Sequence, residues 1–188
     1  MNLLGHLYFS CNDKELMLAN LFGDHFHGRN YSHFPKIIQH GITLHRQIDH
    51  YIDHHETVKE LRLQLYHDLP KVAGIAIDLY FDHLLAEHWS SYHHLPMDLF
   101  LDQFYGFHSQ YWEDYPGDFQ LFIDQLKTNK WINHYGTTYG LSKSSEGVGK
   151  RLSFKNKLSE APTVYLSNKA VIQDAFGTFM KDAIQQFS

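Results

Sequence analysis

The sequence predicts an all-α protein, a single-domain bundle of about seven helices over residues 1–188. Apolar residues recur at helical spacing, and few segments show the period-two alternation that is typical of β-strands. Hydrophobic residues make up 43% of the chain and charged residues 20%, which is typical of a globular domain with a substantial core. No long linker, repeat or low-complexity tract divides the chain.

The helices are expected in the following order. The first begins near Asn12 or Asp13, either of which can cap a helix, and ends at about His27, before Gly28. The second covers residues 35–55, with Pro35 in its first turn. The next four cover residues 56–69, 70–89, 97–114 and 118–136. A segment rich in Gly, Ser and Lys, residues 140–158, is expected to be a link to a last helix at residues 168–187.

Composition narrows the cellular setting. The single cysteine, Cys11, excludes an internal disulfide, and the N-terminal stretch lacks the basic region of a signal peptide. Both features predict a cytoplasmic protein. No apolar stretch approaches the roughly 20 residues that cross a bilayer. The net charge of −5 weighs against broad nucleic-acid binding.

The stretch IAIDLYFDHLLAEHW in the fourth expected helix holds two carboxylates among apolar residues. Asp78 and Asp82 are four residues apart, so they lie on the same side of a helix that is apolar on nearly every side. Two buried carboxylates need a compensating cation, because burial without one costs several kcal/mol. That cation could be an arginine in a structural network or a divalent metal ion, and the helix alone favours neither alternative.

The second expected helix carries the pair His45 and Asp49, again four residues apart, and Asp53 extends the acidic side by one turn. Such a pair can offer a nitrogen and an oxygen to a metal ion, or the aspartate can orient the histidine as a base. An exposed polar helix face is the commoner outcome for a single pair of this kind.

Two further residues stand out near the N-terminus. His6 lies in an apolar run, where a histidine is more often a hydrogen-bonded core residue than a ligand. Asp24 ends the apolar stretch of the first expected helix, where it opposes the helix dipole and needs a partner. Asn20 faces the same way and can hydrogen-bond a ligand. Histidines and aspartates from facing helices are a recurrent site for Mn²⁺, Fe²⁺, Mg²⁺ or Zn²⁺, and the lack of cysteine nearby argues against structural zinc.

Four segments carry a resemblance to a known family: MNLLGHLYFS, LANLFGDHFHG, GITLHRQIDHYID and GIAIDLYFDHLLAEHW. In this order and spacing, and with the later GVGKRLSFKNKL, the chain resembles the acyl carrier protein phosphodiesterases. That family is described as a divergent relative of the HD-domain phosphohydrolases. The resemblance implies an HD-domain-like helical fold and a divalent metal, most often Mn²⁺. It also implies hydrolysis of the phosphodiester that joins 4′-phosphopantetheine to a serine of holo-acyl carrier protein.

The resemblance assigns roles to particular residues. The candidates for the metal centre and its surroundings are His6, Asp24, His45, Asp49, Asp78 and Asp82. His83 or His45 can act as a base, or as an acid toward the leaving serine oxygen, and Arg46 can clamp the phosphate. Acyl carrier protein is strongly acidic, so a basic docking face is expected at Lys150, Arg151 and Lys155. A solvated basic loop is the alternative for that segment.

Two other functions fit the same residues. One is an HD-like phosphohydrolase that acts on a nucleotide or another small phosphate ester. The other is a non-catalytic helical protein that binds an acidic partner and uses its polar residues as a salt-bridge network. Metal separates the two classes, because chelation would leave a binding protein functional and Asp78→Asn would be nearly neutral or stabilising there. In a metal-dependent phosphodiesterase the same change would abolish hydrolysis while the fold survives.

Overall fold

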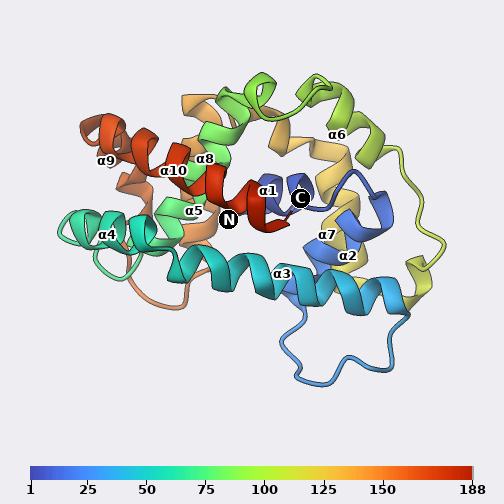
Figure 1. Ribbon diagram of the computed structural model, residues 1–188. Coiled ribbons are helices and arrows are strands. Elements are labelled where there is room, and N and C mark those ends of the chain that lie inside the picture. The colour runs from blue at the N-terminus through green and yellow to red at the C-terminus, as the bar shows by residue number, and fades with distance from the viewer. Residues whose placement is uncertain (188) are drawn as a thin grey trace.

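A computed structural model describes residues 1–187, and within them the chain forms only helices (Figure 1). The α-helices are α1 (Leu3–Tyr8), α2 (Lys14–His25), α3 (Lys36–His54), α4 (Glu56–Leu65), α5 (Ala73–Glu87), α6 (Met97–Tyr105), α7 (Gly117–Asn129), α8 (Thr138–Arg151), α9 (Ala161–Ser167) and α10 (Lys169–Phe187). Four short 3-10 helices connect them: η1 (Trp89–Ser91), η2 (Trp112–Asp114), η3 (Trp131–His134) and η4 (Leu158–Glu160). The all-α prediction is confirmed, although the bundle has more helices than the expected seven. Within residues 1–187, no helix is long and apolar enough to span a membrane.

The expected link at residues 140–158 is wrong over most of its length, because α8 occupies it. The Thr137 hydroxyl caps this helix by accepting the N–H of Gly140 at 3.0 Å. Leu141 and Ser145 are buried, and a Cβ at Gly140 would collide with the carbonyl of His134. Tertiary packing therefore outweighs the low helix propensity of this Gly- and Ser-rich segment. Lys150 and Arg151 of this segment therefore lie on a helix, and Lys155 follows the end of that helix.

Two short helices, α1 and α9, were not expected, and the fifth and sixth expected helices end early, at Tyr105 and Asn129. A six-residue helix such as α1 is not stable in isolation. Asp82 on α5 supports it, because the carboxylate accepts the backbone N–H groups of Asn2 (3.1 Å), Leu4 (2.7 Å) and Gly5 (3.1 Å). Helix α1 is therefore anchored on α5.

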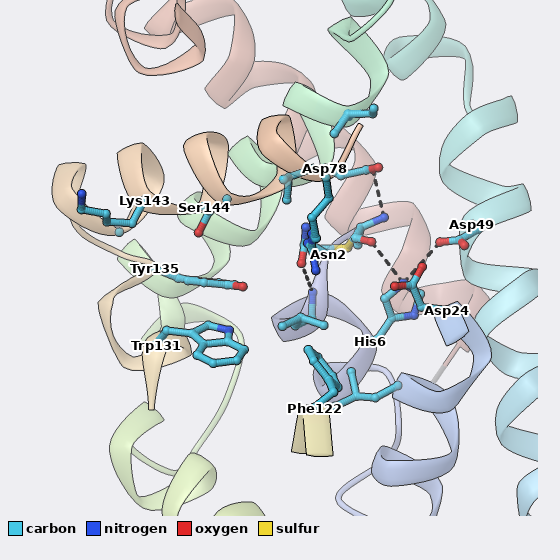
Figure 2. Close-up of a pocket in the computed structure, with 18 of the residues that line it drawn as sticks. Asn2, His6, Asp24, Asp49, Asp78, Phe122, Trp131, Tyr135, Lys143 and Ser144 are labelled. Carbon is cyan, nitrogen blue, oxygen red and sulfur yellow. Dashed lines mark hydrogen bonds and ion pairs between the residues drawn. The ribbon is translucent and has the colours of Figure 1, made fainter. Parts of the chain in front are cut away.

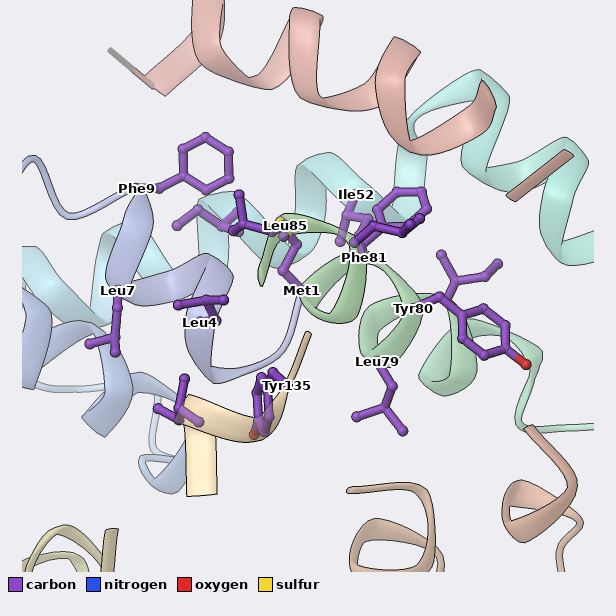
Figure 3. Close-up of a cluster of buried hydrophobic side chains, with 14 of the residues drawn as sticks. Met1, Leu4, Leu7, Phe9, Ile52, Leu79, Tyr80, Phe81, Leu85 and Tyr135 are labelled. Atoms are coloured by element: carbon purple, nitrogen blue, oxygen red, sulfur yellow. The ribbon is translucent and has the colours of Figure 1, made fainter. Parts of the chain in front are cut away.

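Part of the hydrophobic core lies where α1 packs on α5 (Figure 3). Leu4 and Leu7 of α1 are fully buried, as are Tyr80, Phe81 and Leu85 of α5. The prediction that this apolar helix is buried on nearly all sides is confirmed.

Helices α2 and α3 pack closely on each other, and two glycines allow the close approach. A Cβ at Gly41 of α3 would collide with Ala19 of α2, and a Cβ at Gly23 of α2 would collide with the His45 side chain of α3. This crossing places His45 beside the end of α2, and so near α1.

Candidate metal centre and its cavity

A cavity of about 840 Å³ lies between two groups of helices (Figure 2). Residues of α1, α2, α3 and α5 form one side, and residues of η3 and α8 form much of the other. The structure brings six of the predicted site residues to this cavity: His6, Asp24, His45, Asp49, Asp78 and Arg151.

Three of these residues form a compact group. Nε2 of His6 lies 3.2 Å from Oδ1 of Asp49, and Nε2 of His45 lies 3.1 Å from Oδ2 of the same carboxylate. The two imidazole rings are stacked, with centroids 4.1 Å apart and planes at 16°. One ligand atom from each residue lies within 4.8 Å of the other two, which suits a single metal ion. Both histidines are buried, whereas Asp49 is 46% exposed toward the cavity.

The hydrogen bonds of His6 fix where its proton lies. The Asn20 amide nitrogen donates to the His6 carbonyl and to the Ser10 hydroxyl, so the Asn20 amide oxygen faces Nδ1 of His6 at 2.9 Å. Nδ1 must therefore carry the proton and donate it. Nε2 then carries no proton and has a lone pair. It nevertheless faces two acceptor oxygens, one from Asp49 and one from the Met1 carbonyl at 3.1 Å.

That arrangement needs a cation. Burial, with the charge of His45 acting in the same direction, lowers the pKa of His6 to about 4, so the ring is neutral at neutral pH. Burial alone raises the pKa of Asp49, but the His45 and His6 rings beside it hold that pKa below its usual range. Two imidazoles and one carboxylate are ligands that divalent transition metals accept, and a metal ion would satisfy the lone pair that His6 directs at Asp49.

Asp24 and Asp78 border the cavity outside this group of three. Asp24 is exposed at the end of α2, on the same side of the cavity as His6 and Asp49 (Figure 2). Oδ1 of Asp78 lies 3.0 Å from the buried amino group of Met1. Burial raises the pKa of Asp78, and this ammonium group opposes the shift. The cation that Asp78 needed is thus an ammonium group.

The structure does not bring Asp82, His83 or Arg46 to the cavity. Burial raises the pKa of Asp82 to about 7, against the Met1 ammonium and the backbone donors of α1. Nδ1 of buried His83 lies 2.7 Å from the carbonyl of Tyr135. Arg46 donates to the carbonyl of Gly28 at 2.6 Å and borders a separate, smaller hollow.

The opposite wall of the cavity was missed at the level of sequence. It carries Trp131, Tyr135, Tyr139, Lys143, Ser144 and Gly147, from η3, α8 and the turn between them. Figure 2 shows Trp131 and Tyr135 projecting from this side into the space that faces Asn2. The segment was interpreted partly as the end of a helix and partly as a link, and no local pattern marks it as a binding wall. Of the basic residues, Arg151 borders the cavity, while Lys150 and Lys155 are exposed outside it.

Comparison with known proteins identifies the family of this chain. A family model described as acyl carrier protein phosphodiesterase matches residues 1–183. Proteins named acyl carrier protein phosphodiesterase from Salmonella agona (strain SL483) and Salmonella newport (strain SL254) are each 32% identical over 139 residues, covering 72% of this chain and 70% of theirs. No solved structure gives a significant match. The chain belongs to the acyl carrier protein phosphodiesterase family.

Proposed function

We propose that the protein hydrolyses the phosphodiester between 4′-phosphopantetheine and the serine of holo-acyl carrier protein, and releases apo-acyl carrier protein. The observation that carries the proposal is the group His6, His45 and Asp49 at the wall of a large cavity. A phosphodiester is an anion that resists nucleophiles, so its hydrolysis at neutral pH calls for a cation, which a group of this kind can bind. Family membership supplies the substrate class.

Within this proposal, His6, His45 and Asp49 would hold the metal ion, and Mn²⁺ is the expected one. A divalent ion supplies Lewis-acid chemistry, because it neutralises phosphate charge and makes water a better nucleophile at neutral pH. Asn20 keeps the proton on Nδ1 of His6, so that Nε2 stays available as a ligand. The exposed Asp24 carboxylate at the cavity can accept a proton from the attacking water.

Arg151 is the side chain that we assign to the phosphate itself. It borders the cavity and forms no ion pair with any of residues 1–187, so its guanidinium group is available to an anion. Burial raises the pKa of the Tyr135 phenol, and the positive charge of Arg151 opposes that shift. The roles that sequence suggested for His83 and Arg46 stay predictions.

The docking face for acyl carrier protein is proposed at the end of α8, around Lys150, Arg151 and Lys155. Lys150 and Lys155 are exposed, and neither pairs with a carboxylate among residues 1–187. Their neighbour Arg151 borders the cavity, so an acidic partner held here would lie beside the site. The double variant Lys150→Glu/Lys155→Glu should raise KM for acyl carrier protein and flatten its dependence on salt, with the Mn²⁺ affinity unchanged. An unchanged KM and salt dependence would contradict this docking face.

One experiment tests the activity directly. Purified protein is incubated with holo-acyl carrier protein and Mn²⁺, and mass spectrometry follows the loss of phosphopantetheine from the carrier protein. The expected result is complete conversion to the apo form with Mn²⁺ and none after chelation. Turnover of a simple phosphodiester without any loss from the carrier protein would overturn the substrate assignment and favour a small phosphate ester. No hydrolysis of either compound would favour a non-catalytic binding protein.

A further inference from the structure

The cavity has two chemically different walls. On one side lie imidazoles and carboxylates, among them His6, Asp24 and Asp49. On the other lie aromatic, basic and hydroxyl-bearing side chains of η3, α8 and the turn between them. If a phosphodiester binds at the first wall, the remainder of the substrate must occupy the space in front of the second.

One face of α8 forms the second wall. Its cavity-lining residues include Tyr139, Lys143, Ser144, Gly147, Val148 and Arg151, at the spacing of a single helix face. The large side chains stand at the two ends of this row. The middle of the row is formed by Ser144, Gly147 and Val148, so the cavity extends close to the helix backbone there.

Gly147 is the residue in this row that the protein's own packing does not explain. Glycine inside a helix is disfavoured relative to alanine. Its backbone does not have a positive φ, and a Cβ at this position would meet no atom within 4 Å. Gly140, by contrast, is required by contact with the His134 carbonyl. A side chain at position 147 would project into open space at a helix face that borders the cavity.

We infer that this face of α8 binds the 4′-phosphopantetheine arm and that Gly147 sets the width of the passage for it. The inference rests on the proposed function and adds the binding wall for the arm to it. The arm is a narrow, flexible chain with amide groups, so it suits a shallow groove that offers hydroxyls. The Ser144 side chain and the Tyr135 phenol border the same cavity as Gly147 and can hydrogen-bond the amides of the arm.

The test compares two glycines that differ in one respect. Gly177 in α10 is also exposed, also inside a helix, and also has no atom within 4 Å of a Cβ position, but it does not border the cavity. Gly147→Ala and Gly177→Ala should each raise Tm by about 2–4 °C, because alanine favours the helix. Gly147→Leu should weaken binding of 4′-phosphopantetheine, measured by calorimetry, about tenfold or more, since an overfilled site typically costs that much. Gly177→Leu should leave that affinity unchanged.

The possible outcomes are distinct. An unchanged Mn²⁺ affinity in Gly147→Leu shows that the rest of the site is intact, so weaker binding of the arm then supports the inference. Wild-type affinity in Gly147→Leu, equal weakening in Gly177→Leu, or no binding of 4′-phosphopantetheine by the wild type would each overturn it. If the wild type binds 4′-phosphopantetheine but removes none from holo-acyl carrier protein, the proposed function fails and the binding wall stands.

Discussion

Replacing Asp49 by asparagine tests the proposed metal centre most directly. The Asp49 carboxylate faces Nε2 of His6 with one oxygen and Nε2 of His45 with the other, at 3.2 and 3.1 Å. Asparagine has nearly the same shape, but it carries no charge and keeps a single acceptor oxygen. The variant therefore removes an anionic ligand while it disturbs the packing very little.

The expected effects on folding and on metal binding differ in size. Asp49 is 46% exposed, so solvent screens its hydrogen bonds and the metal-free protein should lose only about 1 kcal/mol or less. A residue that only supports a metal ligand changes affinity by about 10–100-fold, so loss of a ligand should cost at least about 100-fold. At an Mn²⁺ concentration of about 100 times the wild-type Kd, the wild type gains about 2.7 kcal/mol and the variant about 0.4 kcal/mol.

Those free energies correspond to a clear thermal shift. For a chain of this length, each kcal/mol moves Tm by about 2–4 °C. Adding Mn²⁺ should therefore raise Tm by about 5–11 °C in the wild type and by only about 1–2 °C in Asp49→Asn. Differential scanning calorimetry with and without Mn²⁺ measures both shifts, and turnover of holo-acyl carrier protein at the same Mn²⁺ concentration should fall in parallel.

Asp53→Asn is the matched control. Asp53 lies one turn further along α3 and borders the same cavity, but its carboxylate pairs with Arg62 at 3.5 Å. This variant should keep the full Mn²⁺-induced shift. A full shift and normal turnover in Asp49→Asn would refute the metal centre, and so would equal losses in the two variants.

Three further predictions follow from the packing around the site. Gly23→Ala should destabilise the protein by about 1–3 kcal/mol and weaken Mn²⁺ binding, because the new methyl group collides with His45; calorimetry with and without Mn²⁺ measures both effects. Asp82→Asn should lower the free energy of unfolding by about 2 kcal/mol or more, because the Asp82 carboxylate accepts three backbone N–H groups at the start of α1. Urea denaturation with chelator at pH 8 measures this loss. Unchanged stability together with lost metal affinity would instead make Asp82 a metal ligand. Gly41→Ala should lower Tm more than Gly23→Ala, because it meets Ala19 backbone atoms that cannot rotate away.

Local signals allowed much of the fold to be predicted. The Asp13 side chain caps α2 by accepting the N–H groups of Glu15 and Leu16, and α3 and α5 lie within their expected ranges. The pairing of His45 with Asp49 was also predictable, because residues four apart on a helix lie on the same side. Asn20 was predicted to hydrogen-bond a ligand, and in the structure its amide oxygen lies 2.9 Å from Nδ1 of His6, one of the candidate ligands.

Helix α8 could not be predicted in the same way. Its glycines and serines have low helix propensity, and the helix depends on the buried Leu141 and on the contact between Gly140 and the His134 carbonyl. Both contacts form only in the folded protein, so no local sequence pattern indicates them. The cavity wall on α8 was therefore missed together with the helix.

The sequence by itself determined that this protein is helical and which carboxylates and imidazoles share each helix face. Only the tertiary structure decided what each face meets. Asp49, Asp78 and Asp82 look alike in the sequence, yet one meets two imidazoles, one meets an amino group and one meets the backbone of α1. The reason is that helical spacing fixes the neighbours within a turn, whereas the partner across a helix interface is set by packing between distant parts of the chain.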